Sequence, residues 1–325
     1  MNYLENEKHY TGTDLEKIFF QPMLSGPSAE ELGVRILYNM PVPTTVQLWS
    51  GQNNILQKYE STGWTGSPHT TKSQKTIDMK RVKAELGFAA ADYFAMVYEK
   101  IVSGAEVNLG DLSGTQLEEA ETALFKQLLA ENIRATMWVG DTAASSGYNT
   151  FDGFLKQIKE WVDDAMIYHN TYSAQELAKP ETAPALFDDL WLNVSDRLKD
   201  AKPEGQLAYF VTSDIYRLYE KYLDGKGVDS AYTEQINGRP SLAYHGIPVI
   251  DLHLGSYLSN SAFDRSFCFL TDRRNLVLAI NTADFPGNEV RMWYNPDEME
   301  NRQRALFMAG CTVLDSSLVA YSARA

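Results

Sequence analysis

A long helical pattern near the middle of the chain is the feature that most constrains the fold. Thr115 and Glu118 form a T-x-x-E capping box, in which each side chain satisfies a free backbone amide of the first turn. Gly140 provides the stop signal, because glycine readily adopts the left-handed conformation that ends helices. Between them, apolar residues form one broad stripe at helical spacing: Leu117, Ala120, Leu124, Leu128, Leu129, Ile133 and Met137. A helix of this length reaches about 35–40 Å, enough to cross a whole domain.

Patterns typical of β-strands lie on both sides of this helix. Before it, apolar and polar residues alternate between Gly33 and Trp49. After it, we predict an amphipathic helix over 185–201, an apolar strand over 207–211 and a helix that Ser213 caps. The later strand-like runs span 242–244, 248–254, 266–270, 275–280, 289–294 and 304–321. Strands at both ends of the chain and helices in the middle predict an α+β fold.

Two polar segments interrupt these patterns. Residues 1–27 are polar and mixed and end near Gly26-Pro27, which predicts an arm that packs on something else. The segment 59–75 is dominated by Gly, Ser, Thr, Pro and Lys, and Trp64 is the only large apolar side chain between Tyr59 and Ile77. This composition predicts a long exposed loop or hairpin tip. Loops longer than about 12–15 residues are usually functional or disordered.

The charge of the chain argues against nucleic-acid recognition. Its 325 residues include 29 Lys+Arg and 43 Asp+Glu, a formal net charge of -14, whereas nucleic-acid binders usually present a basic field. No run approaches the ~18 apolar residues that span a bilayer, and the start lacks the features of a signal peptide. We therefore expect a soluble protein without a membrane partner. Cys268 and Cys311 lie in apolar, strand-like runs and are expected to be buried free thiols.

Candidate catalytic groups are sparse. Asp251 and His253 alternate along a predicted strand, which would place both side chains on one face, and His245 could join them. A metal-dependent hydrolase that uses this set is one alternative, although such a pair is more often the polar face of a half-exposed strand. The nucleophile-elbow, Walker and dinucleotide-binding motifs are absent, and the glycine-rich stretch 63–67 lacks a following lysine. We assign no catalytic, cofactor-binding or metal-binding residue, and we expect a protein that is not an enzyme.

The order of these parts resembles the major capsid protein of tailed bacteriophages, whose fold is shared with herpesvirus shell proteins and bacterial encapsulins. In that family an arm precedes an extended loop, a long spine helix, a peripheral domain and an axial domain. Here Leu117–Val139 is similar to the spine helix, Gly140 to its end and Asn149–Phe154 to the segment after it. Leu207–Leu223 resembles the entry to the axial domain. The late strands are similar at Gly246–Val249, Phe269–Asp272, Asn275–Leu276, Val290–Tyr294, Ala305–Cys311 and Ser317–Tyr321.

The resemblance implies an α+β capsid fold in five parts. They are an N-terminal arm over 1–33, an extended loop with flanking strands over 34–112, a spine helix and peripheral domain over 113–205, an axial domain over 206–286, and returning strands of the peripheral domain over 287–325. The break at Gly140 is then expected to be a corner in a building block and not an active-site loop.

The resemblance also implies a structural function. Subunits of this family self-assemble into hexamers and pentamers that form an icosahedral shell around viral DNA. The implied partners are other copies of the chain, a portal protein and packaged DNA that is bound without sequence specificity. Because only a short arm precedes the first β-like pattern, we expect a separate scaffolding protein. The implied location is the virion capsid, assembled in the host cell cytoplasm.

Three residues of the polar loop are the implied assembly residues. Trp64 would be an aromatic anchor on a neighbouring subunit, and Lys72 and Lys75 lie where some relatives form a covalent crosslink between subunits. The nearest alternative function is an encapsulin-like compartment shell, which uses the same fold.

Overall fold

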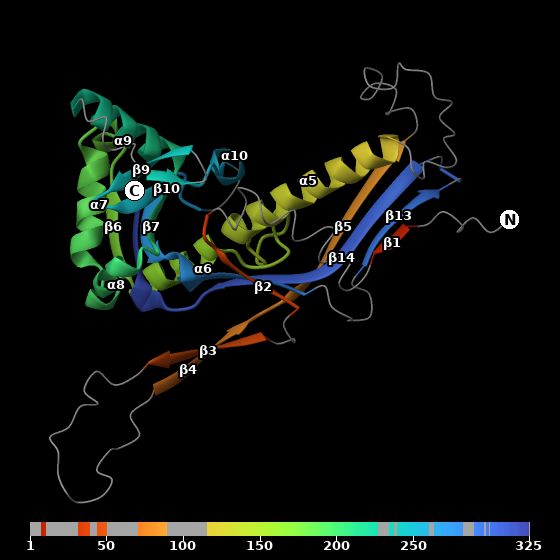
Figure 1. Cartoon of the computed structure of the whole chain (residues 1–325), viewed down its shortest axis with the longest axis horizontal. Helices are drawn as coiled ribbons and strands as arrows, with labels where there is room; N and C mark the ends of the chain where they lie inside the picture. Colours follow the sequence, from red (N-terminus) through yellow and green to blue (C-terminus); the bar gives the residue numbers. More distant parts are fainter. Residues whose placement is uncertain are drawn as a thin grey trace, which may run out of the picture.

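The structure is a computed structural model, and it describes most of the chain. The described residues are 8–10, 32–39, 44–50, 71–89, 116–226, 234–236, 239–259, 263–281, 289–295, 297–298 and 300–324. They form two β-sheets, a long helix that lies along one sheet and ends beside the other, and a separate two-stranded hairpin (Figure 1).

The first sheet is built around β14 (Glu300–Val313), which has strand partners on both edges. On one edge lie β13 (Glu289–Asn295) and β12 (Leu276–Asn281), and on the other lies β5 (Lys80–Ala89), all antiparallel to β14. The sheet is extended by β1 (Lys8–Tyr10) on β13 and by β2 (Arg35–Tyr38), which is parallel to β12. This arrangement confirms strands at both ends of the chain.

The long helix α5 (Gln116–Val139) lies along this sheet (Figure 1). The sequence prediction of a helix that ends before Gly140 is confirmed, while Thr115 lies outside the described residues. Phe125, Leu129 and Ile133 are buried, but Leu124 and Leu128 of the predicted stripe are only half-buried. The core therefore buries only part of the apolar stripe of α5, and the side of the stripe at Leu124 and Leu128 is incompletely covered.

The second sheet contains seven strands, and helices cover one of its faces (Figure 1). Its strands are, in spatial order, β6 (Tyr168–Tyr172), β15 (Val319–Arg324), β11 (Phe267–Asp272), β7 (Leu207–Val211), β10 (Ile247–Asp251), β9 (Arg239–Tyr244) and β8 (Glu234–Ile236). Its helices are α7 (Thr182–Asn193), α8 (Asp196–Asp200) and α9 (Ser213–Lys226). In a second hydrophobic core, Phe187 of α7 packs against both Tyr209 of β7 and Tyr219 of α9.

The hairpin of β3 (Thr44–Ser50) and β4 (Thr71–Ile77) projects away from both sheets (Figure 1). Its base is fixed by a small third core, in which Ile77 and Met79 are buried against Val277, Met308 and Leu314. Beyond this base, β3 and β4 pair only with each other among the described strands.

Three local predictions were wrong. The helix expected over 185–201 is divided, because Val194 and Ser195 have extended ψ angles of 158° and 146°, and the Ser195 hydroxyl donates a hydrogen bond to the Ser317 carbonyl. Residues 71–75 belong to strand β4 and not to a loop, since each pairs with a residue of β3. The strand expected over 248–254 ends at Asp251, because His253 has a positive φ of 49°.

The last segment of the chain supplies strands to both sheets. Strands β13 and β14 lie in the first sheet, and β15 lies between β6 and β11 of the second. The chain therefore passes from one sheet to the other between Val313 and Val319. None of the helices in the described ranges has the length and apolar character that crossing a membrane requires.

A close crossing of two backbones explains one glycine. Gly310 of β14 lies under the turn between β4 and β5, and a Cβ atom there would lie 2.6 Å from the Asp78 carbonyl oxygen and 3.2 Å from the Met79 Cα. Because both neighbours are backbone atoms, they cannot move aside as a flexible side chain would.

We predict that Gly310→Ala destabilises the subunit by about 1–3 kcal/mol, the usual range for overpacking a well-packed site. Gly87→Ala in the facing strand β5 is the matched control, because its Cβ would meet only the Glu300 carboxylate, at 3.5 Å. Chemical denaturation of the unassembled subunits measures both effects. Equal midpoints for the two variants would contradict the close crossing.

Candidate functional site: the corner after the long helix

Two glycines bring the ends of the segment after α5 into contact. The Gly140 amide donates to the Thr136 carbonyl, and the Gly153 amide donates to the Gly140 carbonyl at 2.8 Å. A Cβ on Gly153 would lie 2.7 Å from the Gly140 nitrogen, and one on Gly140 would meet the Phe151 carbonyl. Only glycine fits at both positions, so the chain turns sharply from α5 into α6 (Phe154–Asp163).

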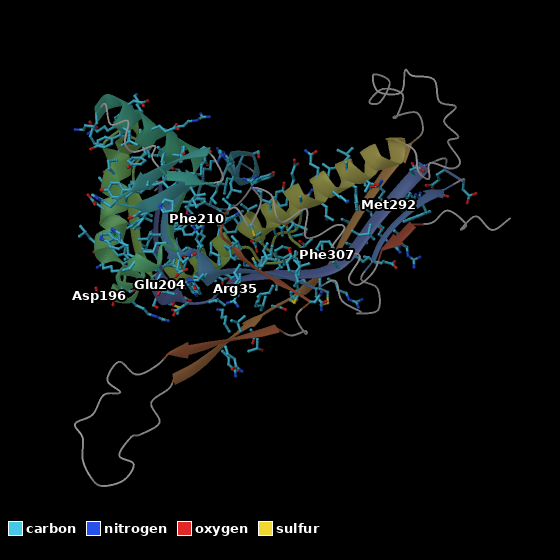
Figure 2. The ribbon with its side chains drawn as sticks, in the orientation of Figure 1. Arg35, Asp196, Glu204, Phe210, Met292 and Phe307 are labelled. Atoms are coloured by element: carbon cyan, nitrogen blue, oxygen red, sulfur yellow. The ribbon has the colours of Figure 1, made fainter. Side chains whose placement is uncertain are left out.

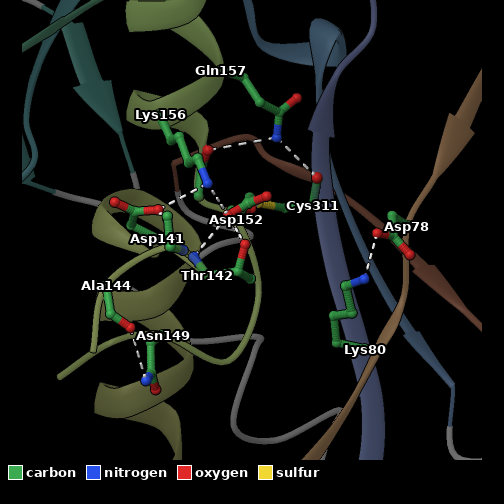
Figure 3. Close-up of polar contacts among 12 residues, drawn as sticks. Asp78, Lys80, Asp141, Thr142, Ala144, Asn149, Asp152, Lys156, Gln157 and Cys311 are labelled. Carbon is green, nitrogen blue, oxygen red and sulfur yellow. Dashed lines mark hydrogen bonds and ion pairs between the residues drawn. The ribbon is translucent and has the colours of Figure 1, made fainter. Parts of the chain in front are cut away.

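A lysine joins the two sides of this corner, as Figure 3 shows. Lys156 Nζ lies 2.8 Å from Asp141 Oδ1 and 2.7 Å from Asp152 Oδ1. The amide and the hydroxyl of Thr142 both donate to the same Asp152 oxygen, each at 2.8 Å. One ionic cluster therefore joins Asp141 at the start of the loop, Asp152 near its end and Lys156 in the first turn of α6.

The pKa values of the corner residues show that this cluster stays ionised. The hydrogen bond from Lys156 lowers the pKa of Asp141 below its usual value. Partial burial alone would raise the pKa of Asp152, but the hydrogen bonds from Lys156 and Thr142 outweigh it and the pKa is lowered. Burial would lower the pKa of Lys156, but Asp141 and Asp152 raise it overall. A charged lysine between charged carboxylates is an ion pair and not a nucleophile.

Gln157 ties the corner to the first sheet. Its side-chain Nε2 donates to the Cys311 carbonyl at 3.0 Å (Figure 3). Its Oε1 accepts from the Val313 amide at 3.0 Å. Pairing between β14 and β5 stops at Ala309. The Gln157 amide therefore takes the place of a strand partner for the next backbone groups of β14, which would otherwise lie buried and unpaired.

The thiol of Cys311 lies at the same junction. Its Sγ donates to the Asp152 carbonyl at 2.9 Å. Cys268 is buried in β11 of the other sheet, and both cysteines are free, which confirms the prediction of buried free thiols. Burial raises the pKa of both thiols, so neither is a thiolate that could act as a nucleophile.

Trp138 connects the corner to the second sheet. Its fully buried ring lies 5.2 Å from the Phe154 ring centroid, 5.8 Å from that of Phe210 in β7 and 6.2 Å from that of Phe269 in β11. Aromatic pairs at these separations add stability beyond the area they bury. Figure 2 shows Phe210 within the second sheet, beside the end of α5. The last turn of α5 is thus packed on one face of the second sheet, within the first hydrophobic core.

Of the three residues expected to act in assembly, the structure describes the side chain of Lys75 alone. Trp64 lies outside the described residues, and Lys72 is described only by its backbone, which pairs with Trp49. The Lys75 ammonium lies 5.4 Å from the ring centroid of Trp161, on α6. Sequence reasoning missed this cation–π contact, because nothing in the spacing of the two residues indicates that β4 passes α6.

Asp251 and His253 are in contact, although they do not share one face of a strand as predicted. His253 lies beyond the end of β10, and its Nδ1 is 3.1 Å from Asp251 Oδ2. The other Asp251 oxygen accepts hydrogen bonds from the Ser213 hydroxyl at 2.9 Å and from the His253 amide at 2.8 Å. These bonds hold the turn after β10 against the start of α9.

His245 lies apart from this pair and is exposed. It occupies the turn between β9 and β10, with a positive φ of 50° and its ring against Tyr244. Over the ranges that the structure describes, no three His, Cys, Asp or Glu side chains are grouped as a metal site would require.

Comparison with solved structures identifies the fold. The chain is similar to a protein of the satellite phage P4 procapsid that includes the size determination (Sid) protein, with 9% identity, 97% of this chain and 92% of that chain covered, and a TM-score of 0.59. It is also similar to the capsid of Myoviridae phage XM1, with 10% identity, 92% of both chains covered and a TM-score of 0.50. A third similarity is to the capsid of cyanophage P-SCSP1u, with 13% identity, 97% and 95% covered, and a TM-score of 0.50.

These likenesses extend over almost the whole chain and confirm the predicted fold of the tailed-phage major capsid proteins. At such low identity they concern the fold alone. No protein-family model matches the sequence, and no curated protein matches it either.

We predict that Lys156→Met lowers the stability of the subunit by about 1–3 kcal/mol, because two partly buried carboxylates lose their hydrogen-bonded cation. Denaturation across a range of pH measures the difference from wild type. Both carboxylates have lowered pKa values, so the difference should be full above about pH 4 and should shrink as the pH falls through their folded-state values.

Lys221→Met is the matched control for this variant, since Lys221 is an exposed lysine on helix α9. Its effect should stay within about 0.5 kcal/mol at every pH. A Lys156→Met effect no larger than this control, or one that persists undiminished at pH 2, would contradict the role of the ionic cluster.

Proposed function

We propose that this chain is the major capsid protein of a tailed-phage-like particle, in which copies assemble as hexamers and pentamers into an icosahedral shell around DNA. The observation that carries the proposal is the β3–β4 hairpin. A two-stranded hairpin is marginally stable in water, and this one extends beyond the small core at its base. A surface supplied by another copy of the chain would complete it.

The rest of the fold suits a shell subunit. The two sheets and α5 form a body joined by buried contacts at Trp138 and Gln157. Such a body keeps its shape while each copy contacts several neighbours at once. Interfaces that are individually modest then add up through their number. The hairpin is fixed at its base, at Ile77 and Met79, and the strands beyond this base would bend to meet neighbours at slightly different angles.

The proposed domains follow the order inferred from the sequence. An arm over 1–33 and the extended segment 34–112 would make contacts between subunits, 113–205 would include the spine helix and peripheral domain, and 206–286 would form the axial domain. Within the returning segment 287–325, the pairing of β15 with β11 supports assigning 319–324 to the axial domain instead of the peripheral one.

Of the three candidate assembly residues Trp64, Lys72 and Lys75, the first two remain our candidates for contacts between subunits. Trp64 belongs to the segment between the paired ends of β3 and β4, where it would meet a neighbour. Lys75 already contacts Trp161 within its own chain, so we assign it to holding the hairpin against α6. Lys72 is then the better candidate for a contact, or a crosslink, with another subunit.

The remaining partners follow from the proposed function. A separate scaffolding protein would direct the curvature of the shell, and a portal protein would occupy one vertex. DNA would be enclosed without sequence-specific contacts, and the net charge of -14 is compatible with packing and release because it disfavours tight binding to phosphate. The chain would be located in the virion capsid after assembly in the host cytoplasm.

Electron microscopy of the purified protein tests this function. We expect closed shells from the wild-type chain. Replacement of residues 51–70 by Asn-Gly, a two-residue turn that suits a tight hairpin, should leave the pairing of Ser50 with Thr71 possible. This variant should give a folded subunit that forms no closed shell.

A second variant separates length from composition. It replaces 51–70 by a Gly/Ser sequence of equal length and should also fail, because it lacks Trp64 and the other side chains of the tip. Normal shells from both variants would show that the hairpin tip has no role in assembly. A wild-type chain that stays monomeric under all assembly conditions would contradict the proposed function. Shells that enclose a protein cargo and no DNA would favour the encapsulin-like alternative.

A further inference from the structure

A groove with a volume of about 360 Å³ runs between α5, β5 and the loop after α5. Its floor consists of buried side chains, among them Phe125, Leu129 and Phe307. Its walls are half-buried apolar side chains, with Leu128 on α5 and Val82 and Leu86 on β5. Left open, the groove would expose these apolar walls to water, which is unfavourable in proportion to their area.

Both walls show that the coverage of this groove is incomplete. Leu128 belongs to the apolar stripe of α5 but remains half-buried, although Leu129 beside it is buried. On β5, Val82 and Leu86 pack against the first hydrophobic core but are also only partly covered. Within the described part of the chain β5 pairs with β14 alone, so its other edge has no strand partner.

The chain outside the described ranges includes a suitable occupant. Residues 90–115 connect the end of β5, at Ala89, to the start of α5, at Gln116, which are the two elements that form the walls. This connection is far longer than the typical ~4–6 residues. It contains the apolar run Tyr93-Phe94-Ala95-Met96-Val97-Tyr98, followed by Ile101-Val102.

We propose that the segment Tyr93–Val102 docks into the groove of its own chain and completes the core between α5 and β5. Extended chain spans about 3.3 Å per residue, so the residues on either side of this segment are long enough to lead it along β5 and back to α5. The short tether gives the segment an effective local concentration of the order of millimolar. It would therefore occupy the groove before a second copy of the chain could.

Thiol labelling tests the proposal in the full-length chain. Leu128→Cys places a reporter on the wall of the groove, and Glu131→Cys places a matched reporter on an exposed position of the same helix. The native Cys268 and Cys311 are buried and contribute no background in folded protein. In unassembled subunits we expect Leu128→Cys to react with a maleimide at least tenfold more slowly than Glu131→Cys.

A second change identifies the cover. Replacing Phe94, Val97 and Ile101 by serine in the Leu128→Cys chain should speed its labelling at least fivefold and leave Glu131→Cys unchanged. If Leu128→Cys lowers the folded fraction seen by circular dichroism, Val82→Cys on the opposite wall provides the same readout. The inference does not depend on shell formation, because it concerns the subunit alone.

Each other outcome overturns the proposal. Equal labelling of Leu128→Cys and Glu131→Cys in unassembled subunits would mean that the groove is open. Protection that appears only in particles would mean that a second copy of the chain covers it. Protection that the triple serine variant leaves unchanged would assign the cover to a different segment.

Discussion

Backbone pairing on both edges of β14 is the constraint on which the rest of the structure depends. One edge pairs with β13 and then β12, and the other pairs with β5 as far as Ala309. A strand fixed on both edges cannot slip by one residue, because that would turn Ala305 and Phe307 away from the core. The positions of α5, the corner and the hairpin are all set relative to this strand.

The pairing of β14 with β5 ends at Ala309, and this end sets the position of the corner between α5 and α6. At Gly310 the chain between β4 and β5 crosses close above β14 and leaves it. Beyond that point the side-chain amide of Gln157 forms hydrogen bonds with the Cys311 carbonyl and the Val313 amide of β14. These bonds hold α6 against the strand. Gly140, Gly153 and the Lys156 cluster allow α6 to follow α5 at that point. The result is a body in which Trp138 packs the end of α5 on the second sheet, and from which the β3–β4 hairpin projects.

Much of this arrangement follows from local sequence signals. The stop at Gly140 marks the end of α5, and the apolar runs mark β7, β11 and β12, because these elements bury a regular pattern. The division of 185–201 was not predictable, since the Ser195 hydroxyl finds its partner at Ser317, far along the chain. The same reason hides Gln157 and the Lys75–Trp161 contact, where one ordinary polar side chain acquires a role only through tertiary packing. Strand β4 was missed because Thr, Lys, Ser and Gln form a strand here only by pairing with β3.

Amide hydrogen exchange, compared between unassembled subunits and assembled particles, tests the central claim that a body built on β14 carries a hairpin completed by neighbours. The account predicts that peptides from 303–313 and 129–139 exchange slowest in both states. Peptides from 44–50 and 71–77 should exchange rapidly in free subunits and at least tenfold more slowly in particles. Hairpin peptides that are as protected as β14 in free subunits, or that gain no protection on assembly, would contradict the account.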